Sequence, residues 1–377
     1  MTCLLLALLS VQSLSSFLQE AVNHGDVAGV VALVISGDRV IYHEAFGKQD
    51  VGRGVPMQRG SIFYIASMTK PITSVAALML VDEGRLGLDD RVDKYLPDFN
   101  PQVIADVDAA AGTYRLRAPA RPITVRHLMT HTSGIGYSWS DPRLALVEKK
   151  SGSSLLTLLH DPGERWTYGE GTTILGQIIA KISGQPLDAF FAWRIFGPLG
   201  MRDTSFALPG EKRSRVVTVQ QRKDGRLVEA PLPAELRGHP RGDGGLYSTA
   251  ADYGAFLRAL LDGRFLSPTS LRALTTNQLG ALVVQLQPTA DPETARPFPL
   301  GAGSDGWSLG FQIASAPTPG AHRRSVGSYG WAGFFNTFFW VDPQKKIAAV
   351  LLMRVLPFYD ERCIAVLQGF EERVYAE

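Results

Sequence analysis

The chain has 377 residues, of which 45% are hydrophobic and 20% are charged, and its formal net charge is +2. This composition is typical of a globular protein, and the length favours two structural units with a sizeable core. The sequence contains no dense run of Lys and Arg, which argues against binding to nucleic acid or to an anionic membrane surface. We therefore expect a small-molecule substrate and a monomer or small homo-oligomer.

The first apolar segment, residues 3–9, is too short to span a bilayer. It fits either the start of a helix that runs over residues 15–24 and ends at Gly25, or the core of a signal peptide that no Lys or Arg precedes. We favour the helix and a cytoplasmic location, with a secreted or periplasmic protein as the alternative. Cys3 and Cys363, the only cysteines, match no metal or redox spacing, so we expect no disulfide framework, metal or cofactor.

Residues 30–36 and 39–47 are rich in β-branched residues and flank a Gly-Asp turn, which predicts a β-hairpin. Apolar residues at helical spacing predict a helix from about residue 67 to Gly84. Residues 86–241 show helical patterns broken by Pro and Gly, without convincing alternating strands. Strands are predicted again over residues 307–314, 334–341 and 346–355. A last amphipathic helix buries Cys363, Val366, Leu367, Phe370 and Val374.

Strands at both ends of the chain and helices between them predict an α/β layer with an inserted helical lobe. The most informative motif lies where the predicted helix begins, in the sequence IASMTKPIT. Lys70 follows Ser67 by one helical turn, so its amine can reach the serine hydroxyl. Pro71 fits a first helical turn. A lysine partly withdrawn from water can accept the serine proton, and the helix N-terminus favours the developing oxyanion, so Ser67 is a candidate nucleophile.

The segment SMTKPIT resembles the nucleophile motif of serine β-lactamases and penicillin-binding proteins, and most closely that of the family VIII carboxylesterases, which are similar to class C β-lactamases. Five further segments resemble that family in the same order: LMTHTSGIG, PGERWTYGEGTTILG, GPLGMRDTSF, GDGGLYSTAADYGAFL and GWAGFFNTFFWVDP. The resemblance implies a mainly antiparallel sheet flanked by helices. It implies an α/β domain of residues 1–65 and 245–377, a mostly helical domain of residues 66–244, and an active site at their interface.

The resemblance assigns the second catalytic position to Tyr168, in the sequence WTYGEG. A phenol beside a lysine ammonium can take the serine proton or return one to the leaving group. Gly169 and Glu170 depart from the family pattern. Glu170 could hold Lys70 in its charged form, which would favour Tyr168 as the base, or it could face solvent, and the sequence leaves both interpretations open.

The third family element is a strand beside the site, which here reads Trp331-Ala332-Gly333-Phe334. β-Lactamases carry a lysine where this chain has Trp331, so the resemblance implies an apolar wall in place of an anion anchor. We expect Ala332 and Gly333 to line the substrate site, with glycine giving the substrate room to approach. The backbone amides of Ser67 and Phe334 would form the oxyanion hole.

Two other motifs are weaker. Ser308 lies in a G-x-S-x-G pattern, but a strand follows it and His322, the only later histidine, precedes every later aspartate, so the elbow of α/β-hydrolases is not expected. Residues 301–306 fit G-x-G-x-x-G but lead to no helix, which argues against a dinucleotide site. His131 is expected to be structural, because the histidines show no metal-ligand spacing.

These observations predict a carboxylesterase that acts on short-chain esters through an acyl-enzyme on Ser67, with Lys70 and Tyr168 as the proton-transfer pair. A β-lactamase, a D-amino-acid peptidase and an acyltransferase share this chemistry and remain alternatives. A non-catalytic penicillin-recognising binding protein is the alternative from another class, although the presence of all three residues argues against it. Measurable but weak β-lactam hydrolysis is expected, well below short-ester hydrolysis in kcat/KM.

Overall fold

The computed structural model describes residues 2–108, 110–231, 240–315 and 323–376, with side chains from residue 12 onward. Its centre is an antiparallel sheet of eight strands in the order β11-β12-β13-β14-β15-β1-β2-β3. The strands are β1 (Gly29–Ser36), β2 (Arg39–Asp50), β3 (Val55–Pro56), β11 (Gly306–Trp307), β12 (Gln312–Ile313), β13 (Tyr329–Gly333), β14 (Thr337–Asp342) and β15 (Ile347–Leu352).

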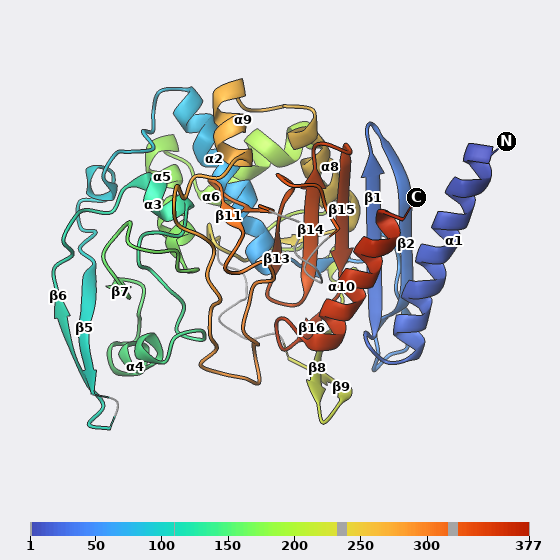
Figure 1. The fold of residues 1–377 in the computed structure, drawn as a ribbon, viewed down its shortest axis with the longest axis horizontal. Coiled ribbons are helices and arrows are strands. Elements are labelled where there is room, and N and C mark those ends of the chain that lie inside the picture. The colour runs from blue at the N-terminus through green and yellow to red at the C-terminus, as the bar shows by residue number, and fades with distance from the viewer. Residues whose placement is uncertain (1, 109, 232–239, 316–322, 377) are drawn as a thin grey trace.

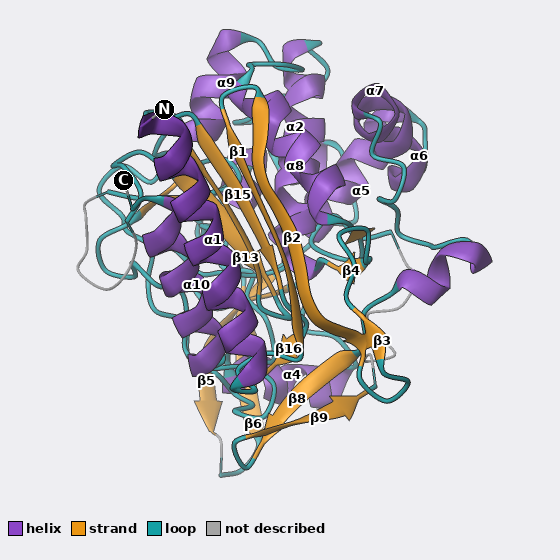
Figure 2. Cartoon of the chain, turned by 90° about the vertical axis from the view of Figure 1, so that its right-hand side faces the viewer, coloured by secondary structure: helices purple, strands orange, loops and turns teal. Residues whose placement is uncertain are grey.

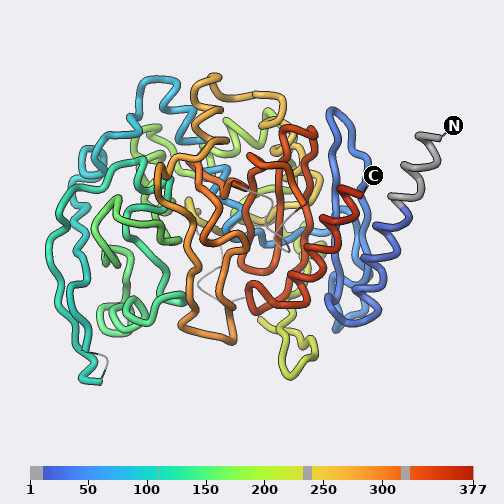
Figure 3. Tube along the Cα trace, viewed as in Figure 1, coloured from blue at the N-terminus to red at the C-terminus, as the bar shows by residue number. Residues whose placement is uncertain are grey.

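The two ends of the chain build this sheet together. Strand β1 pairs with β15, so that Val31 lies opposite Leu352 across more than three hundred residues of sequence. Figure 3 shows the blue and red ends of the trace side by side, with the green middle segments on the opposite side of the molecule. This arrangement confirms the predicted fold class. The exact domain boundaries stay a prediction, although all eight strands fall within the predicted α/β domain.

Helices cover both faces of the sheet, as Figure 2 shows. Helices α1 (Thr2–Asn23) and α10 (Glu361–Val374) lie on one face, and α2 (Thr69–Asp82) and α8 (Ala250–Leu261) lie on the other. Strand β1 is therefore buried along nearly its whole length, which explains its continuous apolar sequence. As predicted, Cys363 is buried in α10, whereas the side chain of Cys3 lies outside the described part of the chain.

The remaining elements surround this core (Figure 1). The other helices are α3 (Val125–Met129), α4 (Pro142–Ser151), α5 (Gly171–Ser183), α6 (Leu187–Phe191), α7 (Gly197–Leu199) and α9 (Pro268–Thr275). Three small sheets pair β4 (Phe63–Tyr64) with β10 (Tyr247–Ser248), β5 (Gln102–Asp108) with β6 (Thr113–Arg117) and β7 (Thr157–Leu158), and β8 (Val219–Lys223) with β9 (Arg226–Ala230) and β16 (Val355–Leu356). Within the described residues, no helix is long and apolar enough to cross a membrane.

Some predicted elements were wrong in detail. Residues 86–241 contain strands β5, β6, β8 and β9, which the sequence did not reveal because few of their residues are buried, so no regular buried alternation marks them. Residues 307–314 form no single strand, since a turn separates β11 from β12. The strand expected over residues 334–341 begins only at Thr337, because Asn336 adopts a φ of 57° in the turn that follows β13.

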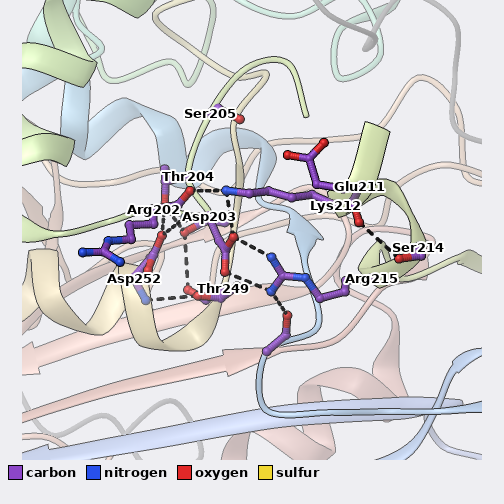
Figure 4. Close-up of polar contacts among 12 residues, drawn as sticks. Arg202, Asp203, Thr204, Ser205, Glu211, Lys212, Ser214, Arg215, Thr249 and Asp252 are labelled. Carbon is purple, nitrogen blue, oxygen red and sulfur yellow. Dashed lines mark hydrogen bonds and ion pairs between the residues drawn. The ribbon is translucent and has the colours of Figure 1, made fainter. Parts of the chain in front are cut away.

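A polar network connects residues 203–215 with the start of α8 (Figure 4). Asp203 forms ion pairs with Lys212 at 3.0 Å and Arg215 at 2.6 Å. The Asp252 carboxylate, at the start of α8, accepts hydrogen bonds from the Asp203 amide at 2.8 Å and the Thr204 hydroxyl at 2.9 Å. Residue 205 then pairs with β10, which in turn pairs with β4. The network therefore supports β4, the strand that precedes Ser67 in the sequence.

Candidate active site

Ser67 lies in a short 3-10 turn, Ala66–Met68, between β4 and α2. It is half-buried while its neighbours from residue 61 to residue 70 are buried, so the turn presents this side chain to the cavity described below. Ala66 adopts a φ of 44°, in the left-handed region that costs a non-glycine residue about 1–3 kcal/mol. Strain of this kind is common at functional sites. The turn also places Ser67 next to the N-terminus of α2, whose free amides favour negative charge.

Lys70 is buried in the first turn of α2, with 1% of its surface exposed. Its Nζ lies 3.1 Å from Ser67 Oγ, 2.8 Å from Tyr137 Oη and 2.9 Å from the backbone oxygen of Asp243. The contact with Ser67 is the one that the sequence spacing predicted. The other two partners come from loops far away in the sequence, and sequence reasoning missed both.

Tyr137 and Asp243 form a buried pair beside Lys70. The Tyr137 hydroxyl donates to Asp243 Oδ2 at 2.6 Å, and Arg241 donates to both carboxylate oxygens at 2.9 Å. Burial and the neighbouring carboxylate raise the pKa of Tyr137 well above its usual value, so this phenol stays neutral. Although burial alone would raise the pKa of Asp243, Lys70 and Arg241 hold it well below its usual range. The carboxylate is therefore ionised.

Tyr168 lies on the other side of Lys70, within an aromatic cluster. Its ring centroid is 4.8 Å from Lys70 Nζ, and its hydroxyl accepts a hydrogen bond from Trp331 Nε1 at 3.0 Å. Trp331 is only 6% exposed and packs edge-on against Trp307, with ring centroids 4.6 Å apart. The observed contacts of Trp331 therefore hold Tyr168 in place. That Trp331 forms an apolar wall of the substrate site, as expected from the sequence, stays a prediction.

The end of β13 lies close to the Ser67 turn. A Cβ atom on Gly333 would come within 2.3 Å of the Ile65 backbone oxygen, so only glycine permits this approach. The structure thus gives Gly333 a packing role that differs from the substrate clearance expected. Ala332 is buried with Trp331 beside a separate cavity of about 50 Å³. Phe334 follows β13 and lines the same cavity as Ser67, and the oxyanion hole formed by their amides stays a prediction.

The Ser67 cavity has a volume of about 320 Å³. Its lining combines aromatic side chains with charged groups. The aromatic residues are Tyr64, Tyr137, Trp139 and Phe334, and the charged residues are Glu148, Glu170, Arg241 and Asp243. A cavity of this size and lining can hold a small ester with an apolar part and a polar part.

Glu170 faces this cavity and does not point away into solvent. Its carboxylate lies 3.3 Å from Arg241, so Arg241 joins Glu170 to Asp243. Burial and the nearby Asp243 carboxylate raise the pKa of Glu170 to about 7, although Arg241 and Lys70 act in the opposite direction. Glu170 therefore changes its charge near neutral pH.

Comparison with known proteins shows the family of the chain. The beta-lactamase family model matches residues 14–368. The chain belongs to the beta-lactamase family. Esterase EstB of Burkholderia gladioli is 29% identical over 90% of this chain and 89% of its own length. Monacolin J acid methylbutanoyltransferase of Aspergillus terreus is 28% identical over 95% of this chain and 94% of its own length.

A solved structure agrees with this assignment. The LovD6 mutant of simvastatin synthase from Aspergillus terreus is 25% identical and superposes with a TM-score of 0.85 over 97% of this chain and 94% of that protein. The family thus includes both an esterase and an acyltransferase among the relatives of this chain.

The weaker motifs do not form competing sites. Ser308 is fully buried in the turn between β11 and β12, where its Oγ accepts the amide hydrogens of Gly310 and Phe311. His322 lies outside the described residues. His131 is buried, its Nδ1 accepts the Gly169 amide at 3.3 Å, and burial lowers its pKa well below the usual value. Among the described residues, no cluster of three potential metal ligands occurs.

Proposed function

We propose that this protein is a carboxylesterase that hydrolyses short-chain carboxylic esters through an acyl-enzyme on Ser67. The observation that carries the proposal is the buried Lys70 amine 3.1 Å from the half-buried Ser67 hydroxyl, which lines a cavity with several aromatic side chains. The esterase among the relatives supports the same reaction class.

In the acylation step, Ser67 Oγ attacks the ester carbonyl carbon while its proton passes to neutral Lys70. The carbonyl oxygen becomes an oxyanion, which the amides of Ser67 and Phe334 and the N-terminus of α2 would stabilise. The bond to the alcohol oxygen then breaks, and the alcohol takes up a proton as it leaves. An acyl group remains on Ser67.

Tyr168 is proposed to supply the proton to the leaving alcohol. Its oxygen already accepts the Trp331 indole hydrogen, so its own hydrogen is available to an acceptor in the site. Lys70 then returns the serine proton to Tyr168, and a water molecule attacks the acyl-enzyme by the same steps in reverse order. The products are the carboxylic acid and regenerated Ser67.

Acyl transfer is a second candidate function, because an alcohol that replaces water at the acyl-enzyme would give a new ester. The transferase among the relatives favours this candidate. A β-lactamase or a D-amino-acid peptidase is less favoured, because Trp331 stands where the family's lysine would bind the substrate carboxylate. A non-catalytic binding protein would not need the Lys70–Ser67 contact. The natural ester, the oligomeric state and the cellular location stay predictions.

The test uses nitrophenyl esters of increasing acyl length and a chromogenic cephalosporin. The wild type should hydrolyse the short esters with a higher kcat/KM than the cephalosporin, and mass spectrometry should detect the acyl group on Ser67. Ser67→Ala should remove the activity and the mass shift, whereas Ser308→Ala should keep both because Ser308 faces the protein interior. Activity in Ser67→Ala and its loss in Ser308→Ala would contradict the proposal.

A further inference from the structure

We infer that Asp243 is a positioning residue, whose carboxylate fixes the direction of the hydrogen bonds from Asp243 through Tyr137 to Lys70 and so aims the lone pair of neutral Lys70 at Ser67. This inference rests on the proposed function, because it concerns the activation of Ser67. Asp243 contacts both Tyr137 and Lys70: its side chain accepts a hydrogen bond from Tyr137, and its backbone oxygen lies 2.9 Å from Lys70 Nζ.

The direction of each bond follows from counting hydrogens. An ionised carboxylate only accepts, so the hydrogen of Tyr137 must point to Asp243 Oδ2 at 2.6 Å. The Tyr137 oxygen can then only accept from Lys70, 2.8 Å away, and the Asp243 carbonyl oxygen also only accepts. A neutral amine has two hydrogens, and these two acceptors use both. Its lone pair is left for the third neighbour, Ser67 Oγ at 3.1 Å.

The surroundings keep the Asp243 carboxylate charged and fixed in orientation. Arg241 Nε binds Oδ1 and its terminal nitrogen binds Oδ2, a two-point contact that prevents rotation of the carboxylate. Glu170 reaches the cluster through Arg241, whose guanidinium supplies the positive charge beside Asp243. A neutral amide at position 243 could donate to Tyr137 instead. The Tyr137 hydrogen would then turn toward Lys70 and compete with Ser67 for the lone pair.

A different role for Asp243 would be to act as a counter-ion that keeps Lys70 protonated. The two roles predict different pH profiles of the acylation rate. Loss of a counter-ion would favour the neutral amine that accepts the serine proton, so the acylation rate on the alkaline plateau would not fall. Loss of orientation lowers the plateau itself, because the lone pair of neutral Lys70 is no longer directed at Ser67.

The experiment measures the pre-steady-state acylation rate with a nitrophenyl ester across pH in four enzymes: wild type, Asp243→Asn, Tyr137→Phe and the double variant. We expect Asp243→Asn to lower the alkaline plateau about 100-fold in the wild-type background, and less than about 3-fold in the Tyr137→Phe background. An unchanged plateau, or an equal loss in both backgrounds, would overturn the inference, since Asp243 would then not act through Tyr137.

Asp342→Asn is the matched control. Asp342 is another buried carboxylate that accepts backbone amides, those of Ser325, Gln344 and Lys345, but it ends β14 and does not line the Ser67 cavity. Its variant should acylate at the wild-type rate. If Asp243→Asn does not fold, as judged by circular dichroism, Arg241→Gln provides a second route, because it frees the carboxylate to rotate. The plateau should again fall in the wild-type background and stay nearly unchanged in the Tyr137→Phe background, and multiplying losses would overturn the inference.

The acyl-enzyme assay separates this inference from the proposed function. If the wild type forms no acyl group on Ser67 with any ester of the series, the proposed function itself fails. If the wild type acylates and Asp243→Asn acylates equally fast on the alkaline plateau, only the role of Asp243 fails.

Discussion

Two tyrosines flank Lys70, and their hydroxyl groups have opposite hydrogen-bond directions. On one side, Tyr137 donates its hydrogen to Asp243 and offers its oxygen to Lys70. On the other side, Tyr168 accepts the indole hydrogen of Trp331 and keeps its own hydrogen. The rings are neighbours, with centroids 5.5 Å apart, yet one is set in a charged network and the other in an aromatic cluster.

This difference shows how one residue type can serve two steps of a reaction. The fixed hydrogen of Tyr137 suits orientation of the amine before the attack. The available hydrogen of Tyr168 suits protonation of the leaving group after it. The partners decide the role, since a carboxylate and an indole N–H impose opposite directions on the same phenol.

Tyr168→Phe should have the largest effect, and the effect should depend on the leaving group. Hydrolysis of an alkyl ester should fall by about 10²–10⁴-fold, because an alkoxide needs a proton to leave. Hydrolysis of a nitrophenyl ester should fall much less, because nitrophenolate leaves without one. Comparison of kcat/KM for the two esters checks this. An equal loss on both would remove Tyr168 from the leaving-group step.

Tyr137→Phe should lower acylation by about 10²-fold on both kinds of ester, because it acts on the nucleophile before the leaving group departs. The same pair of substrates provides the measurement, and Tyr114→Phe in the exposed strand β6 is a control that should leave both rates unchanged. A loss confined to alkyl esters would assign Tyr137 to the same step as Tyr168.

Glu170→Gln should test the charged network around Tyr137 through the stability of the protein. Glu170 is two residues from Tyr168 in the sequence, but its carboxylate binds Arg241, which belongs to that network. Folding raises its pKa from 4.5 to about 7, so its contribution to stability is present below pH 4.5 and is lost as pH rises through 7. The free energy of unfolding of the wild type should therefore fall relative to the variant by up to about 3 kcal/mol between these pH values. Urea unfolding of both proteins across pH measures it, and parallel curves would show that Glu170 titrates normally.

Trp331→Phe should have the smallest effect. It removes the donor to Tyr168 but keeps an aromatic ring in the cluster, and one neutral hydrogen bond is worth about 0.5–1.5 kcal/mol. We expect kcat/KM on alkyl esters to fall by about 3–10-fold, with little change on nitrophenyl esters. A fall larger than that of Tyr168→Phe would mean that the indole acts other than through Tyr168.

The sequence revealed the part of the site that local spacing determines. Ser67 and Lys70 are three residues apart at a helix start, so their contact could be predicted, and the family resemblance located Tyr168. Tyr137 and Asp243 come from loops that meet Lys70 only in the folded chain. The available signals were weak: Asp243 interrupts a glycine run two residues after Arg241, and Tyr137 follows the segment HTSGIG. Neither signal indicates that Tyr137 and Asp243 form a hydrogen bond with each other.

Dependence on neighbours that are distant in the sequence also explains which strands could be predicted and which could not. Continuous apolar strands such as β1 were found because burial on both faces leaves a clear pattern. The surface strands β5 and β9 carry few buried residues, so their pairing depends on neighbours that the sequence pattern does not show. Trp331 was expected to face substrate because its position matches a family site. Its packing depends on Trp307, which the sequence predicted only as part of a strand.

The size of the Ser67 cavity has a consequence for the fate of the acyl group. A volume of about 320 Å³ corresponds to on the order of ten water molecules at the density of liquid water. An acyl chain that fills little of this space leaves several waters near the ester carbonyl, and each is a competitor of any acceptor alcohol. A bulkier acyl chain, or an alcohol that packs against the aromatic residues of the cavity, displaces these waters. The partition between hydrolysis and transfer should therefore follow how completely the two organic groups together exclude water.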